Sequence, residues 1–144
     1  MSDVAKVLEA KESEVLTIDA ESTVFEAIKQ MVDANVGALL VTEGGRVTGI
    51  VTERDYLRRV TLEGRTEEET LVREIMTSPL VYVTPDTSVE ECMAVMTERR
   101  IRHVPVFTEG RDLVGIVSIG DVVKHKMSQL EFERDQLDSY VHQT

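Results

Sequence analysis

The stretch Gly49-Ile50-Val51-Thr52-Glu53-Arg54-Asp55 decides the fold, because it returns downstream as Gly115-Ile116-Val117-Ser118-Ile119-Gly120-Asp121. The two copies start 66 positions apart, at residues 49 and 115. Upstream, matched apolar residues stand 65 positions apart: Ile18 and Val83, Val24 and Val89, Met31 and Met96, Val36 and Ile101, Val41 and Val106. One residue is therefore gained between these pairs and the motif, most simply around Asp112. A tandem repeat of this kind predicts two supersecondary units that pack face to face, since neither buries its apolar face alone.

Length and composition predict one compact globular body. The chain has 144 residues, with 42% hydrophobic and 30% charged residues, which is ordinary for a globular protein. No run approaches the roughly 18 apolar residues that suggest a membrane span, and the N-terminal segment lacks the pattern of a secretory signal. Cys92 is the single cysteine, so we expect no intrachain disulfide and a reducing, cytoplasmic compartment.

The net charge excludes one class of partner. It is −11, from 16 basic and 27 acidic residues. Binding to nucleic acid depends largely on neutralising phosphates with Lys and Arg, so this charge argues against it. A locally basic pocket could still bind a small anion such as a nucleotide.

Each repeat shows the same order of elements. In repeat one, a strand at 15–18 precedes a helix at 23–32, which Ser22 or Thr23 is placed to cap. A hairpin of strands 37–41 and 47–51 follows, and a second helix begins at Asp55. Repeat two has a matching strand at 80–83 and a helix behind Thr87 and Ser88. The pattern predicts an α/β fold of two strand–helix–strand–strand–helix units.

The repeat spacing also predicts the domain organisation. We expect repeat one over residues 7–60, a polar connection over 61–71, repeat two over 72–126 and a helical tail over 127–144. Val7 stands 65 positions before Val72. The N-terminal segment should therefore play in repeat one the part that the segment from Val72 plays in repeat two.

The tail carries an apolar stripe. Alternating steps of four and three separate Val123, Met127, Leu130, Leu137 and Val141, with Arg134 in the remaining slot. This spacing is consistent with a helix that pairs with another helix. The same stripe would also suit a helix that folds back on its own domain, and both interpretations stay open.

The repeated motif has a structural and a chemical interpretation. In each copy a hydroxyl residue, Thr52 or Ser118, is followed three positions later by Asp55 or Asp121. That arrangement is typical of a helix N-cap, and a single copy favours plain capping. A carboxylate in the first turn could instead accept hydrogen bonds from both ribose hydroxyls, while the hydroxyl and the helix N-terminus meet phosphate.

A second candidate group is Arg102-His103. Arg offers a planar fork for phosphate oxygens, and His adds a donor that can be partly charged near neutral pH. The matching residues of repeat one, Gly37 and Ala38, carry no charge, so the two sites should be unequal. In isolation, Arg102 could pair with a surface acid and His103 could be a satisfied core residue.

Taken together, the doubled unit, the two motif copies and the Val-Arg-Glu-Ile-Met-Thr opening at 72–77 resemble a pair of CBS domains, the module named after cystathionine β-synthase. The resemblance covers about residues 7–126 and is to free-standing pairs without an attached enzyme or transporter. It implies two repeats joined through their sheets with pseudo-twofold symmetry, two clefts, and a homodimer of pairs.

The resemblance also implies a ligand, which is AMP, ADP or ATP and less commonly S-adenosylmethionine or NAD. Asp121 would hold the ribose hydroxyls with Ser118 beside it, and Arg102 and His103 would face the phosphates. Near the adenine the same cleft would be bordered by Ser22 and Ala27. The second cleft would use Asp55, Thr52, Arg54, Thr87 and Cys92.

The sequence leaves three candidate functions to be tested. The first is a non-catalytic energy sensor that binds an adenine nucleotide and modulates a partner protein. The second is a ligand-independent dimeric scaffold that acts through its tail helix. The third is a nucleotide-processing enzyme with Ser118, His103 and Asp121 as its catalytic group, which the sequence favours least because it has no nucleophile elbow and no P-loop. We expect no metal site, since the histidines lack ligand spacing.

Overall fold

The computed structural model describes residues 2–11 and 14–142 and divides the chain into two compact units. Unit 1 combines the N-terminal segment up to residue 13 with residues 82–144, and unit 2 spans residues 14–81. Each unit contains one copy of the repeated motif, at Asp121 and Asp55 respectively. The predicted α/β fold of two repeats with a C-terminal helix is confirmed.

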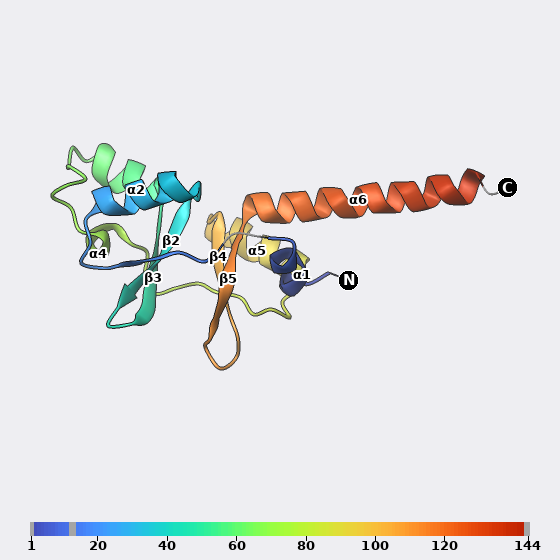
Figure 1. Cartoon of the computed structure of the whole chain (residues 1–144), viewed down its shortest axis with the longest axis horizontal. Coiled ribbons are helices and arrows are strands. Elements are labelled where there is room, and N and C mark those ends of the chain that lie inside the picture. Colours follow the sequence, from blue (N-terminus) through green and yellow to red (C-terminus); the bar gives the residue numbers. More distant parts are fainter. Residues whose placement is uncertain (1, 12–13, 143–144) are drawn as a thin grey trace. The chain divides into compact units, whose positions relative to one another are not determined.

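Unit 2 is built on a three-stranded sheet in the order β1-β2-β3 (Figure 1). β1 (Thr17–Asp19) runs parallel to β2 (Ala38–Glu43), which pairs antiparallel with β3 (Arg46–Thr52). The hairpin turn uses Gly44 and Gly45 at φ 58° and 81°. A two-residue hairpin turn of this type needs both residues in the left-handed region, which glycine adopts without strain. The predicted hairpin is confirmed.

α2 (Val24–Ala34) packs its apolar face on this sheet. Thr23 caps the helix, because its Oγ1 accepts from the amide of Glu26 at 3.2 Å. Of the two capping residues that the sequence offered, the structure selects Thr23. The helix ends at Asn35, whose φ of 54° is the left-handed conformation common after a last helical turn.

The rest of unit 2 completes the core. α3 (Glu53–Tyr56) continues into the π-helix η1 (Leu57–Thr61), and α4 (Val72–Ile75) follows the connection. The connection packs against the start of α2, where the amide of Val24 donates to the carbonyl of Thr70 at 2.8 Å. Thr70 is buried, and its Oγ1 donates to the carbonyl of Thr66 at 2.7 Å.

Unit 1 contains the second hairpin, of β4 (His103–Phe107) and β5 (Leu113–Ser118), and α5 (Val89–Arg99), which Ser88 caps. Both hairpins carry a register shift at matched positions, after Val41 and after Val106. The turn that joins β4 to β5 is closed by the amide of Thr108, which donates to the carbonyl of Asp112 at 2.9 Å. Five residues lie between Phe107 and its partner Leu113, against four between the matched pair Thr42 and Val47, so this segment holds the residue gained in repeat two.

The strand predicted at 80–83 is wrong. Only Val83 pairs, in a single parallel bridge with Val106. In unit 2 the amide of Leu40 donates to the carbonyl of Leu16, and the amide of Ala20 donates to the carbonyl of Thr42. The counterparts of Leu40 and Ala20, 65 positions later, are Pro105 and Pro85. Proline has no amide hydrogen, so both flanking hydrogen bonds of the ladder are lost.

The opening helices are exchanged between the repeats. α1 (Val4–Glu9) packs Val4 and Val7 into the core of unit 1, with α5, β4 and β5. α4, which opens repeat two in the sequence, packs Val72 and Ile75 into the core of unit 2. The structural units therefore differ from the sequence repeats by the exchange of these two short helices.

α6 (Ile119–His142) is one helix of 24 residues with no break between repeat two and the tail. Its first turns pack on unit 1 through the buried Val122, and it then runs well past β4, β5 and α5 (Figure 1). Leu130 and Leu137 are each 64% exposed, so this part of the stripe does not fold back on unit 1. The side chain of Val141 lies outside the described part of the structure. In the described residues, no helix is both long enough and apolar enough to cross a membrane.

Candidate functional site

The motif of unit 2 forms a complete capping box at the start of α3. Asp55 Oδ2 accepts from the Thr52 amide at 2.9 Å and from Thr52 Oγ1 at 3.1 Å. In return, the amide of Asp55 donates to Thr52 Oγ1 at 3.2 Å. The capping interpretation of the sequence is confirmed in this repeat.

The motif of unit 1 repeats this geometry at the start of α6. Asp121 Oδ2 accepts from the Ser118 amide at 2.8 Å, and the amide of Asp121 donates to Ser118 Oγ at 3.1 Å. The hydrogen bonds found within each motif use only Oδ2 of the aspartate. Capping thus leaves Oδ1 of each carboxylate for other partners.

A lysine that the sequence analysis missed joins the site of unit 1. Lys11 Nζ donates to Asp121 Oδ2 at 2.8 Å and to the carbonyl of Ile116 at 2.7 Å. Lys11 and Asp121 are about three-quarters buried, with 25% and 23% of their side chains exposed. The residue 65 positions after Lys11 is Met76, so the repeat itself gave no signal for a paired cation here.

The two aspartates consequently differ in their ionisation. For Asp121, burial acts to raise the pKa, but the hydrogen bonds from Lys11 and the Ser118 amide outweigh it and lower the pKa below its ordinary value. For Asp55, burial is the largest effect and raises the pKa despite the hydrogen bonds from Thr52. Arg59 and Arg58 act in the opposite direction on Asp55 without cancelling that effect.

Strand pairing brings His103 to the motif of unit 1. His103 lies directly opposite Ser118 in the β4–β5 register, and the amide of Ile119 donates to the carbonyl of Arg102 at 2.8 Å. In unit 2, Ala38 lies opposite Thr52 and the amide of Glu53 donates to the carbonyl of Gly37 at 3.1 Å. The predicted match of Arg102-His103 with Gly37-Ala38 is therefore confirmed, and the basic side chains occur only in unit 1.

The surroundings of His103 shift its pKa. Burial lowers its pKa, and the positive charges of Lys11 and Arg102 lower it further, while the charge of Asp121 partly compensates. The imidazole is therefore less charged near neutral pH than a solvent-exposed histidine would be. A neutral His103 can donate one hydrogen bond and accept another.

Other predicted residues have structural roles in these units. Ala27 and Cys92, at matched positions in α2 and α5, are core residues with at most 1% of their surface exposed. Burial also raises the pKa of the Cys92 thiol. Ser22 is half-buried, and its carbonyl accepts from the amide of Val72 at 2.8 Å. Thr87 Oγ1 accepts from the amide of Thr84 at 3.1 Å, in the turn before α5.

Arg54 is exposed on α3, one residue before Asp55. Its neighbour in the next turn, Arg59, donates from Nη1 to the carbonyl of Ile75 at 3.1 Å. In the described part of the chain, no three His, Cys, Asp or Glu side chains gather closely enough to hold a metal ion.

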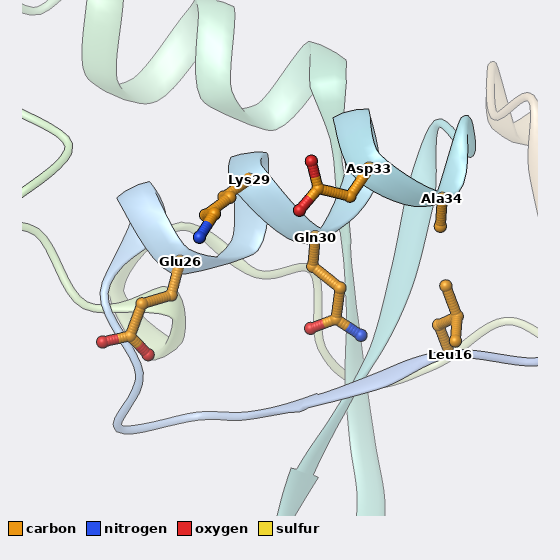
Figure 2. A pocket seen from close by; sticks show the side chains of 6 residues that line it. All are labelled: Leu16, Glu26, Lys29, Gln30, Asp33 and Ala34. Atoms are coloured by element: carbon orange, nitrogen blue, oxygen red, sulfur yellow. The ribbon is translucent and has the colours of Figure 1, made fainter.

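A surface hollow of about 420 Å³ lies beside α2 in unit 2 (Figure 2). It is lined by Leu16, Glu26, Lys29, Gln30, Asp33 and Ala34. Gln30 points across it toward β1, where its Nε2 donates to the carbonyl of Thr17 at 3.1 Å (Figure 2). None of the residues predicted for ligand binding lines this hollow, so it is not part of the candidate site.

Comparison with known proteins identifies the family. The model of the CBS domain matches residues 4–61 and again residues 72–128. The chain belongs to the CBS-domain family. Pairs of CBS domains are regulatory modules that typically bind nucleotides.

Two curated relatives are CBS-domain proteins. The chain is 43% identical over 126 residues to CBSX3 of Arabidopsis thaliana, a mitochondrial CBS domain-containing protein, and covers 61% of its length. It is 35% identical over 125 residues to the CBS domain-containing protein YhcV of Bacillus subtilis and covers 88% of its length. The matches take in 84% and 87% of this chain, respectively.

Solved structures share the CBS-pair fold. A protein from Burkholderia ambifaria, described as a signal-transduction protein with CBS domains, is 46% identical with a TM-score of 0.84; the match covers 88% of this chain and 95% of that one. The hexameric CBS-CP12 protein of bloom-forming cyanobacteria is 31% identical with a TM-score of 0.76 and coverages of 85% and 70%.

Proposed function

We propose that this protein is a regulatory CBS pair that binds an adenine nucleotide and thereby modulates a partner protein. The observation that carries the proposal is the group of residues in unit 1, where Lys11 binds the Asp121 carboxylate and Arg102-His103 lies across the strand pair from Ser118. A carboxylate beside several donors suits a ligand that carries both a ribose and phosphates. Nothing comparable surrounds Asp55, which has no lysine partner among the described residues.

In this proposal Asp121 accepts hydrogen bonds from the ribose hydroxyls, and Ser118 lies beside them. Oδ1 of Asp121 is available to the ribose, since both Lys11 Nζ and the Ser118 amide bond Oδ2, each at 2.8 Å. Lys11, beside the carboxylate, joins Arg102 at the phosphates, and His103 adds a hydrogen-bond donor.

The second site is proposed to bind more weakly. It would use Asp55, Thr52 and Arg54. The raised pKa of Asp55 works against a charged carboxylate, and Gly37 and Ala38 bring no phosphate donor. AMP, ADP or ATP is the proposed ligand, ahead of S-adenosylmethionine and NAD.

Calorimetric titration of the purified protein with AMP, ADP, ATP, S-adenosylmethionine and NADH tests the proposal. We expect one adenine nucleotide to bind and Asp121→Ala to weaken it at least about tenfold, because hydrogen bonds to a charged group are lost. Asp55→Ala is the matched control, since it removes the same capping box from the other repeat. Equal binding by Asp121→Ala and the parent protein would refute the role of Asp121, and no binding across the panel would refute the nucleotide proposal.

We also propose that the protein is not an enzyme. The amide of Asp121 donates to Ser118 Oγ, and the hydrogen bonds of the described residues include none between His103 and Ser118. A catalytic serine would need a base within hydrogen-bond reach. Nucleotide turnover that His103→Ala abolishes would contradict this part of the proposal.

Self-association belongs to the same proposal. The CBS-CP12 neighbour is a hexamer, and we propose that this chain forms at least a homodimer of CBS pairs.

A reducing, cytoplasmic compartment is proposed from the single cysteine, Cys92, which is buried.

The scaffold function keeps one observation in its favour, which is the exposed stripe of α6. If the protein acts only as a scaffold, truncation after Lys126 should abolish partner binding while Asp121→Ala leaves it unchanged. The nucleotide sensor requires Asp121→Ala to remove the effect of the ligand on the partner.

A further inference from the structure

The distal part of α6 lies beyond the part of the chain that matches the CBS family. The second family match ends at residue 128, whereas α6 continues to His142. At 1.5 Å per residue, these 14 further residues extend the helix by about 21 Å. Among the described residues, the hydrogen bonds of this segment to the rest of its unit are limited to that of Gln129 with Ser2. A helix segment of this length with so little contact to its own unit needs another source of stability.

From Val123 onward, α6 presents an apolar stripe to solvent, and the stripe continues into the extension. The stripe consists of Val123, Met127, Leu130 and Leu137, with exposures of 50%, 57%, 64% and 64%. Steps of four and three place these residues, with Arg134 between Leu130 and Leu137, on one face. The face that packs on unit 1 is a different one, marked by the buried Val122 and by Lys126, which pairs with Glu90 of α5.

The charges beside the stripe change sign along the helix. Lys124 and Lys126 lie near its start, and four acidic residues follow between positions 131 and 138. Among the described residues, Lys124 takes part in no ion pair, and Glu131 in none either. Heptad spacing puts Lys124, Glu131 and Asp138 on the same flank of the stripe.

We propose that α6 pairs in antiparallel orientation with α6 of a second copy of this chain. Antiparallel pairing sets the basic start of each helix against the acidic distal half of the other, so that Lys124 faces Glu131 of the second copy. Parallel pairing would stack Arg134 on Arg134 and would bring acidic flanks together. The change of charge sign along α6 therefore favours a second copy of this chain as its partner, and it favours the antiparallel orientation.

This interface is independent of the proposed nucleotide site, because it uses none of the residues around Asp121. Its distal residues, Leu130, Glu131, Leu137 and Asp138, lie beyond residue 128, where the second family match ends. Loss of the α6 pairing and loss of nucleotide binding can therefore be distinguished in the same protein.

The first experiment is sedimentation equilibrium of the full chain over a wide concentration range. Leu130→Glu places a charge in the middle of the stripe, and we expect the dissociation constant of the α6-dependent step to rise at least about tenfold. Ser128→Glu is the matched control, because Ser128 is exposed on α6 but off the stripe. Circular dichroism of both variants confirms that they are folded. An unchanged assembly in Leu130→Glu, or a parent protein that is monomeric throughout, would overturn the proposal.

The second experiment tests the orientation by mixing charge variants. Lys124→Glu makes the flank wholly acidic, and the double change Glu131→Lys and Asp138→Lys makes it wholly basic. Each variant alone should associate more weakly than the parent through α6, and an equimolar mixture should recover association at low salt. Recovery supports the antiparallel pair, whereas a mixture that associates no better than either variant would overturn it.

Discussion

Asp55 and Asp121 occupy the same position in the two repeats, yet their pKa values shift in opposite directions. The capping geometry is shared, so the difference comes from the surroundings. Asp121 has Lys11 at 2.8 Å, whereas Asp55 has only the more distant charges of Arg59 and Arg58 against its burial. One lysine therefore makes two copies of a motif chemically unequal.

This difference predicts opposite pH dependences for Asp121→Asn and Asp55→Asn. The lowered pKa of Asp121 stabilises the fold above the unfolded value of about 3.9, and this contribution is lost as the pH falls through the folded value. Asp121→Asn should thus cost about 1 kcal/mol at neutral pH and less in acid. The pKa of Asp55 is raised, so its contribution to the stability of the fold has the opposite pH dependence. It is present below about pH 3.9 and is lost as the pH rises through the folded value.

Urea unfolding of both asparagine variants between about pH 3.5 and 7 measures this contrast. Relative to the parent protein, Asp121→Asn should lose stability as the pH rises, and Asp55→Asn should gain it. Asparagine can keep the cap hydrogen bond from the backbone amide, so the change reports on charge. If the stabilities of the two variants, relative to the parent protein, change with pH in the same direction, the role given to Lys11 is contradicted.

The same residues mark what the sequence could predict of the site. The motif spacing predicted the capping boxes and the inequality of the two repeats, and strand pairing confirms the match of His103 with Ala38. Lys11 could not be predicted, because its contact with Asp121 joins residues 110 positions apart. Its counterpart Met76 would even have argued against a cation at that place.

At the scale of elements, the motif glycines of β3 and β5 meet different neighbours. A Cβ on Gly49 would lie 2.8 Å from Met76 Sδ and 3.0 Å from the carbonyl oxygen of Thr77. That carbonyl is fixed, because it accepts from the amide of Ile50 at 3.1 Å. A Cβ on Gly115 would meet Leu8 Cδ2 at 3.0 Å, which is the end of a flexible side chain.

We therefore expect Gly49→Ala to cost about 2–3 kcal/mol of unfolding free energy and Gly115→Ala about 1 kcal/mol or less. A backbone carbonyl held in a strand pair cannot move away as a leucine methyl group can. Thermal or urea unfolding of the two variants, which carry the same change in the same motif, provides the comparison. A larger cost for Gly115→Ala would show that the close contact of Gly49 with Thr77 does not limit this strand.

Elements with local signals were the ones that sequence reasoning predicted well. Periodicity and turn residues predicted α2, α5 and both hairpins. The strand at 80–83 failed because its ladder depends on partners that lie across the sheet, and two of the required amides belong to Pro85 and Pro105. Both prolines were visible in the sequence, but their effect appears only once the pairing is known.

At the scale of the whole molecule, the exchange of the two opening helices means that the sequence repeats and the structural units do not coincide. Val7 and Val72 are matched by the repeat, and each is buried, but in opposite units. Periodicity shows that both segments are apolar helices; it does not assign either to a core. The expectation that each opening segment serves its own repeat therefore rested on symmetry alone.

Val7→Ala and Val72→Ala test this assignment. Each should cost about 2 kcal/mol, because a buried valine loses two methyl groups. Native-state hydrogen exchange should locate the loss for Val7→Ala in α5, β4 and β5, and for Val72→Ala in α2 and β1–β3. The opposite distribution would mean that the opening helices stabilise the repeats in which the sequence places them.

The exchange of α1 also sets an order of completion during synthesis. A ribosome delivers the chain from its N-terminus, so all of unit 2 has emerged once residue 81 is free. Unit 1 holds the first helix of the chain and its last, and its core must join Val4 and Val7 to residues as late as Val122. The nascent protein thus carries α1 without a partner while more than a hundred further residues are made, so this helix is translated before unit 2 but packed after it.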